Sequence, residues 1–370
     1  MTQEDLRSLF RTVGDGSGLS HTNTYYEEEL ALAFRNRGMP LEGLRYDITP
    51  TGMHYLLIHF DIPDADADSW KLDIGGLVAN PLSLSMADLS ARPKVTMPVT
   101  MECAGNGRAR LNPRPVSQPW LLEAIGTAEW TGTPLRGILE DAGIDSSAVE
   151  LVFTGRDEGV QGGEVQLYQR SLTIEDSMRD EVMLVYEMNG APLEPQHGYP
   201  LRLIVPGWYG MTSVKWLENI EAVAEHFTGY QMDQTYRYKT SPDDPGVPVS
   251  TMRVRALMLP PGVPEFMTRT RLLDSGDVTL SGKAWAGRLD VTQVEVSTDD
   301  GMSWHKAELG KQVGRFAWRN WSYDWNAKPG THFLSVRATD EEGNVQPTAQ
   351  PWTMQGMGNN LVQRVEVIVR

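Results

Sequence analysis

Hydrophobic and polar positions follow one rhythm in the first two thirds of the chain and another rhythm in the last third. In the first part, helical periodicity marks Tyr26–Arg37, which starts rich in glutamate, and Leu135–Ala142, which Gly143 would end. Short apolar runs predict strands between helix-like or Gly/Pro-rich stretches. These runs are His54–Phe60, Leu151–Thr154, Met183–Tyr186 and Leu201–Val205. The mixture predicts an α+β domain with mixed sheets.

The rhythm changes after Ser241–Val249, a stretch rich in proline, aspartate and glycine that is typical of a linker. Beyond it, apolar residues recur at every second position, as in Leu334–Ala338 and Val365–Val369, with turn sequences such as Asp299–Gly301 between them. Short strands at hairpin spacing predict an all-β sandwich. We therefore expect a leader over residues 1–40, an α+β domain over 41–245 and a β-sandwich over 246–370.

Composition supports two globular domains and narrows the choice of partners. The chain has 370 residues, 40% of them hydrophobic and 22% charged, and its net charge is −16. Such a surface repels nucleic acid and anionic lipid, so we expect neither as a partner. No apolar run suits a membrane span, and the N-terminus resembles no signal peptide. As written the chain is expected to be cytoplasmic, or periplasmic if a leader has been removed.

The single cysteine, Cys103, excludes internal disulfides and every metal site that needs several cysteines. Three arginines, Arg108, Arg110 and Arg114, and no acidic residue lie between it and Trp120. Neighbouring guanidinium groups should lower the pKa of the thiol and favour the thiolate, which can act as a nucleophile or as a soft metal ligand. The alternative is a buried structural cysteine beside a glycine turn.

Other candidate groups are less specific. His54 and His59 lie five positions apart on a predicted strand, so we expect them on opposite faces, with at most one in a pocket. Cationic residues and glycines over His197–Lys215, Arg202 among them, suit a phosphate or another fixed anion, although the same run could be a core strand. Aromatic and basic residues in Tyr236–Lys239 precede the linker and could line a cleft.

Taken in order, these segments resemble the sulfite oxidase family of molybdenum enzymes. The cysteine loop TMECAGNGR resembles the family loop that usually ends CAGNRR. The resemblance extends over about residues 40–370 and also rests on Asp73–Leu89, Ala124–Pro134, Val185–Leu217, Val294–Trp304 and Ala317–Trp321. It implies a molybdopterin-binding catalytic domain followed by an immunoglobulin-like dimerisation domain, and hence a homodimer.

The resemblance also implies the site. Cys103 would ligate molybdenum. The residues that would hold the molybdopterin and its phosphate are Tyr55, His59, Asp157, His197, Arg202, Ser213, Val214, Lys215 and Lys239. The residues that would line the oxyanion pocket are Arg108, Trp130, Tyr238 and Arg319, with Tyr238 near the oxo group.

Two departures from the family pattern bear on the substrate. Leu57 stands where the family has an arginine, and Gly107 replaces the first arginine of the usual pair. One lost charge-assisted hydrogen bond weakens anion binding by about 1.5–3 kcal/mol, roughly 10- to 150-fold.

The expected reaction is oxidation of sulfite to sulfate, with the electrons passed to an external acceptor. A molybdenum reductase of a sulfoxide, nitrate or another oxide is the alternative, and a non-catalytic binding protein on the same fold is a third hypothesis. The leader is too short for a cytochrome module, so no haem is expected.

Overall fold

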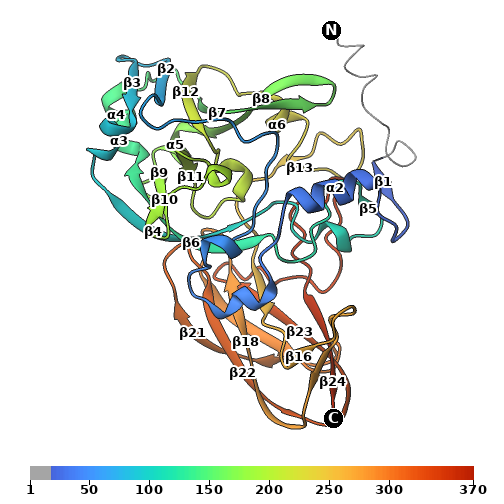
Figure 1. Cartoon of the computed structure of the whole chain (residues 1–370). Helices are drawn as coiled ribbons and strands as arrows, with labels where there is room; N and C mark the ends of the chain where they lie inside the picture. The colour runs from blue at the N-terminus through green and yellow to red at the C-terminus, as the bar shows by residue number, and fades with distance from the viewer. Residues whose placement is uncertain (1–17) are drawn as a thin grey trace.

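Two units stack end to end in the computed structural model, which describes residues 18–370 (Figure 1). The unit that comes first in the chain holds two five-stranded sheets, and the second unit holds a four-stranded and a six-stranded sheet. The chain passes between them through β13 (Arg237–Tyr238) and β14 (Val247–Pro248), which pair across the predicted linker. Strand β14 lies within Ser241–Val249, the stretch that the sequence suggests as a linker.

The first sheet of the N-terminal unit is mixed, as predicted. Its strand order is β3 (Leu82–Ser85), β2 (Lys71–Gly76), β12 (Leu217–Val223), β7 (Glu150–Gln161) and β8 (Glu164–Thr173). Only the β12–β2 pair is parallel. Helix α4 (Leu135–Ala142) buries its apolar stripe in the same core and ends at Gly143, whose φ of 66° suits a residue without a side chain. The predicted helix is therefore confirmed.

The second sheet carries the residues of the site. Its strand order is β10 (Ala191–Pro192), β9 (Met183–Met188), β6 (Ile125–Pro134) and β4 (Val95–Glu102), with β11 (Arg202–Ile204) beside β9. Strand β4 leads directly into Cys103, and β11 begins at Arg202. Shorter elements connect the strands. They are α3 (Met86–Ser90), α5 (Ile174–Ser177), α6 (Tyr230–Asp233), η1 (Leu41–Arg45), η2 (Thr51–Met53), η3 (Arg108–Arg110), η4 (Pro195–His197) and η5 (Gly210–Thr212).

The segment His54–Phe60 is not the predicted strand. Leu56 alone forms an isolated bridge, to Arg37, and the backbone N–H of Ile58 donates to the Asn36 side chain. These partners come from the end of α2 (Glu27–Arg35) and the residues after it. The apolar residues of the segment are thus held by a neighbouring loop instead of by a sheet ladder.

The C-terminal unit consists of two sheets around one core, and most neighbouring strands in them are antiparallel. The smaller sheet orders β15 (Arg255–Met258), β18 (Gly276–Trp285), β22 (Arg319–Ala327) and β21 (Glu308–Gln312). The larger orders β16 (Val263–Pro264), β17 (Arg271–Leu273), β24 (Gln363–Val369), β23 (Gly330–Asp340), β19 (Val291–Ser297) and β20 (His305–Lys306). Side chains from both sheets form the core, and β24 alternates buried and exposed positions as predicted.

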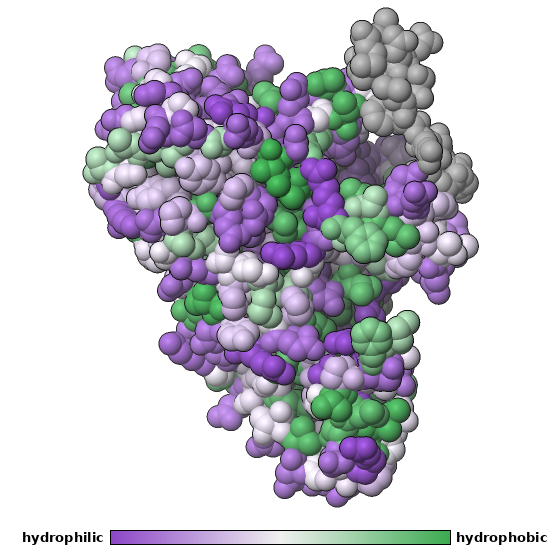
Figure 2. All heavy atoms as spheres, in the orientation of Figure 1, coloured by the Kyte–Doolittle hydropathy of each residue, from purple (hydrophilic) through white to green (hydrophobic). Residues whose placement is uncertain are grey.

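Residues 18–40 pack against the N-terminal unit. Strand β1 (Leu19–Ser20) pairs with β5 (Arg114–Pro115), and α2 confirms the predicted helix over Tyr26–Arg37. The first 17 residues of the expected leader lie outside the described residues. The visible face of the molecule is largely polar, with an apolar patch in the region of α2 (Figure 2), where Leu30 and Phe34 are exposed. Among residues 18–370, no helix has the length and hydrophobicity needed to cross a bilayer.

Candidate functional site

Two adjoining cavities open beside the residue that follows β4. The smaller has a volume of about 70 Å³ and the larger about 690 Å³. Four residues line both cavities: Leu57, His59, Cys103 and Tyr236. The only cysteine therefore lies at the junction between the two cavities.

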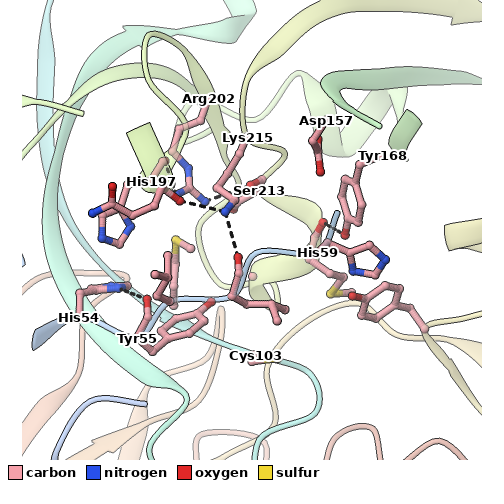
Figure 3. A pocket seen from close by; sticks show the side chains of 17 residues that line it. His54, Tyr55, His59, Cys103, Asp157, Tyr168, His197, Arg202, Ser213 and Lys215 are labelled. Atoms are coloured by element: carbon pink, nitrogen blue, oxygen red, sulfur yellow. Dashed lines mark hydrogen bonds between the residues drawn. The ribbon is translucent and has the colours of Figure 1, made fainter. Parts of the chain in front are cut away.

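The smaller cavity is lined by residues that are far apart in sequence (Figure 3). The segment His54–His59 forms one wall, and the turns that carry His197 and Ser213–Lys215 form another. Both His54 and His59 line this cavity, which corrects the expectation that at most one of them would face a pocket. That expectation depended on the alternation of a strand, and this segment is irregular.

Two cations belong to the smaller cavity, the buried Arg202 and the half-buried Lys215, and both donate to main-chain carbonyl groups. The Arg202 guanidinium donates to the oxygens of His197 and Ser213 at 2.9 and 3.0 Å. The Lys215 ammonium donates to the oxygens of Leu57 and Gln196 at 2.9 and 3.0 Å. Burial lowers the pKa of Arg202 to about 10 and also lowers that of Lys215. An anionic ligand would compensate for the cost of burying these charges.

Neutral imidazoles stand beside these cations. The rings of His54 and His197 meet edge to face with centroids 5.9 Å apart. Burial lowers the pKa of His54 to about 4 and that of His197 to about 2. The Nε2 atoms of both histidines and the Nε of Arg202 are buried without a hydrogen-bond partner. Burial also raises the pKa of Asp157, which faces the same cavity. The wall thus offers unpaired polar atoms to a ligand.

The larger cavity is shared between the two units. It is lined by Leu32 and Asn36 from α2 and the turn after it, by the cysteine loop and by residues 354–357 of the C-terminal unit. Arg108 is its buried cation. Nε of Arg108 donates to the oxygen of Gln355 at 3.0 Å, and Nη1 donates to Oγ of Ser117 at 2.9 Å. A Cβ at Gly105 would lie 2.7 Å from Nη2 of Arg108, so this glycine makes room for the guanidinium.

The Cys103 thiol does not have the predicted low pKa in the metal-free chain. Burial raises its pKa, and the charge of Arg108 opposes that effect only in part. Arg110 is exposed, and the Arg114 guanidinium binds Glu29, so neither supplies the expected charge. A bound metal ion would favour the thiolate independently of the arginines.

Of the two tyrosines in Tyr236–Lys239, Tyr236 lines the cavities and the predicted Tyr238 does not. Tyr236 lines both cavities beside Cys103, with an unusual φ of 52°. Tyr238 lines neither cavity, and its ring packs on the Arg253 guanidinium at 4.3 Å. The two tyrosines are two positions apart in one aromatic and basic run, so nothing in the sequence distinguishes them. Lys239 lines the larger cavity as expected.

Three further predicted residues lie elsewhere. Arg319 lies in β22, where its guanidinium donates to Gly310 and Val291 oxygens, and it lines neither cavity. Val214 packs into the core of the N-terminal unit. Trp130 is fully buried behind the smaller cavity, 4.9 Å from the Arg202 guanidinium. The remaining predicted residues, which line at least one cavity, are Tyr55, His59, Cys103, Arg108, Asp157, His197, Arg202, Ser213, Lys215 and Lys239.

Comparison with known proteins shows the family of the chain. Residues 59–231 match the family described as oxidoreductase molybdopterin binding domain, and residues 248–370 match the Mo-co oxidoreductase dimerisation domain. The crystal structure of the sulfane dehydrogenase SoxCD from Paracoccus pantotrophus superposes with a TM-score of 0.77 at 28% identity, over 88% of this chain and 82% of that one. The chain belongs to the sulfite oxidase-like family of molybdopterin oxidoreductases.

Curated relatives in this family include enzymes of different activity. The chain is 32% identical to human mitochondrial sulfite oxidase, over 87% of this chain and 62% of that protein. It is also 32% identical to nitrate reductase [NADH] 1 of Oryza sativa subsp. japonica, over 87% of this chain and 38% of that protein. The chain therefore spans only part of the length of these relatives.

Proposed function

We propose that this protein oxidises sulfite to sulfate with a molybdenum–molybdopterin cofactor and passes the electrons to an external acceptor. The observation that carries the proposal is the position of Cys103 between a cavity lined by Arg202 and Lys215 and a larger cavity that contains Arg108. In the net reaction, sulfite and water give sulfate, two protons and two electrons. Molybdenum would supply the two-electron chemistry when bound.

The charged and polar residues of the smaller cavity suit the phosphate of the cofactor, and the bulkier pterin would extend into the adjoining cavity of about 690 Å³. The buried Arg202 and the half-buried Lys215 both donate to main-chain oxygens and not to a carboxylate of the described residues, and a phosphate would pair with them. The unpaired Nε2 atom of His197 would bond to a polar atom of the cofactor. Cys103 would ligate the metal as a thiolate, since thiolates are the soft ligand that the chain offers there.

The larger cavity would admit the substrate. Arg108 is held by Gln355, by Ser117 and, at 3.5 Å, by the Met357 sulfur, so its guanidinium is oriented before an anion arrives. The Tyr236 hydroxyl can hold or donate a proton, because burial raises its pKa to about 12. Lys239 adds a second positive charge to this cavity.

One feature of the cavities supports a second function. Leu57 lines both cavities, so the site has an apolar side chain where the family pattern has an arginine. A less charged substrate would lose little from this exchange. The alternative is reduction of nitrate, a sulfoxide or another oxide on the same scaffold, and nitrate reductases are among the relatives.

We propose that the C-terminal unit is immunoglobulin-like and forms a homodimer. Its match to a dimerisation domain and its two-layered β architecture support this proposal. Light scattering at micromolar concentration should give twice the chain mass of 41.3 kDa. A monomer mass would contradict it.

Sulfite-dependent reduction of a one-electron dye by molybdenum-loaded protein tests the function. Saturable turnover that is lost in Cys103→Ser, with unchanged circular dichroism, is the expected result. The same samples are assayed with nitrate and with a sulfoxide, using a reduced dye as donor. Turnover with an oxide and none with sulfite would replace the first function by the second, and full activity of Cys103→Ser would remove the role of the thiolate.

A further inference from the structure

The carboxylate immediately before Cys103 is held by the other unit of the protein. Glu102 ends β4, and its side chain is only 1% exposed. Its Oε1 accepts from Nη1 of Arg255 at 2.6 Å, and its Oε2 accepts from Nε1 of Trp285 at 2.9 Å. Arg255 begins β15 and Trp285 ends β18, so both donors belong to the C-terminal unit.

The Glu102 carboxylate also accepts a hydrogen bond from a residue of the cysteine loop itself. Its Oε1 accepts from Nδ2 of Asn106 at 3.0 Å, and the Asn106 side chain is tied to the backbone of Leu122 and Ala124. Cys103 therefore lies between two residues, Glu102 and Asn106, whose side chains bond to each other. A displacement of the Glu102 carboxylate would be transmitted across the whole cysteine turn.

Further bonds between the units act on this turn. The Asn359 side chain donates to the Gly107 oxygen at 2.8 Å, and Nη1 of Arg255 donates to the Asn359 oxygen at 3.0 Å. The backbone N–H of Gly358 donates to the Ala104 oxygen at 2.7 Å. Residues of the C-terminal unit therefore hold the turn by hydrogen bonds before and after the cysteine.

We propose that Arg255 and Trp285 are positioning residues that set the orientation of the Cys103 sulfur toward the metal, acting through Glu102. This inference rests on the proposed function, because it takes Cys103 as the metal ligand. A buried carboxylate oxygen that loses its donor is costly, so the carboxylate and the turn would shift to find a new partner. Outer groups of this kind orient metal ligands in many sites.

The charge near the sulfur also depends on the C-terminal unit. Glu102 places a negative charge one residue from a thiolate, and the Arg255 guanidinium compensates it at 2.6 Å. Nε and Nη2 of Arg255 are buried without a hydrogen-bond partner, so the guanidinium is directed to the carboxylate and the Asn359 oxygen. The C-terminal unit thereby controls both the geometry and the field at the sulfur.

The test compares two tryptophans at the junction between the units. Trp285→Phe removes the donor to Glu102. Trp318 is also a buried tryptophan, and Trp318→Phe removes a part-buried indole bond, 2.8 Å to the Asp47 oxygen, that does not touch the cysteine turn. Metal-loaded proteins are compared by the electron paramagnetic resonance spectrum of the one-electron-reduced metal and by the rate of molybdenum loss on dialysis against a chelator. We expect Trp285→Phe to lose molybdenum about tenfold faster and to show shifted g values. Trp318→Phe should keep the wild-type values of both.

Glu102→Gln provides a second variant of nearly unchanged shape if Trp285→Phe does not fold. The amide nitrogen of the glutamine would be a donor where the Glu102 carboxylate has an acceptor, and it would face N–H groups that now donate to that carboxylate. Like Trp285→Phe, this variant should therefore shift the spectrum and lose molybdenum faster. Spectra and loss rates that match the Trp318→Phe control in both variants would overturn the inference. Neither readout requires turnover, so a loaded wild-type protein that does not oxidise sulfite would refute the proposed function separately.

Discussion

Leu57 and Cys103 line the same two cavities, so an apolar side chain stands beside the proposed metal ligand. The main chain at this point is fixed, because the Lys215 ammonium donates to the Leu57 oxygen at 2.9 Å. A change of the side chain can therefore alter the charge of the substrate region without releasing the backbone. This relationship makes position 57 the most direct test of substrate preference.

Leu57→Arg should lower the KM for sulfite about 10- to 150-fold, because it adds one charge-assisted hydrogen bond to the anion. Leu57→Met keeps the volume without the charge and should leave the KM within about twofold of wild type. Steady-state kinetics at constant ionic strength measure both. A KM in Leu57→Arg that equals that of Leu57→Met would show that the substrate does not reach this side chain.

Tyr236→Phe should lower kcat about 100-fold, because it removes the hydroxyl that can transfer a proton beside Cys103. Tyr238→Phe is the matched control two positions away, and it should stay within about threefold of wild type because Tyr238 lines neither cavity. Both variants are compared at equal molybdenum content. The reverse pattern would restore the role that the family resemblance gives to Tyr238.

Local patterns predicted the regular elements well. Helix α4 begins and ends where its apolar stripe and Gly143 indicate, and β24 alternates as Val365–Val369 predict. These features depend on neighbours within a few positions, which the sequence displays. The cysteine loop was found for a similar reason, because its lone thiol, glycines and arginines are contiguous.

Long-range contacts explain what the sequence could not show. Arg114 is close to Cys103 in sequence, yet its guanidinium binds Glu29 of α2 and leaves the thiol without its charge. His54 enters a cavity because a turn, and not a strand, carries it there. Arg319 lies in a segment that resembles the family. However, it belongs to β22, which pairs with β18, and its guanidinium donates to the Gly310 oxygen within the C-terminal unit. Each outcome depends on a partner that is remote in sequence.

Glu29→Ala should lower the free energy of unfolding by about 3–5 kcal/mol, because it leaves the buried Arg114 guanidinium without its carboxylate. Asp274→Ala is the control, since its partner Arg370 is exposed and such pairs contribute less than about 1 kcal/mol. Urea denaturation of the metal-free proteins measures both. Equal losses in the two variants would mean that α2 is not held by this pair.

His54 should make the metal-free protein less stable in mild acid. Burial holds its pKa at about 4 against an ordinary value of 6.5, and the charged Arg202 and the His197 ring face it together with Tyr55 and Trp130. Between those two pH values the unfolded chain binds a proton at this position that the folded chain does not, so stability falls as the pH falls from about 6.5 to about 4.

The contribution of His54 to this loss of stability is up to about 3 kcal/mol. His54→Asn should remove it, which makes the dependence of the unfolding free energy on pH shallower by about one proton in urea titrations between pH 7 and pH 4. A slope that does not change in this variant would show that the imidazole is already protonated in the folded protein.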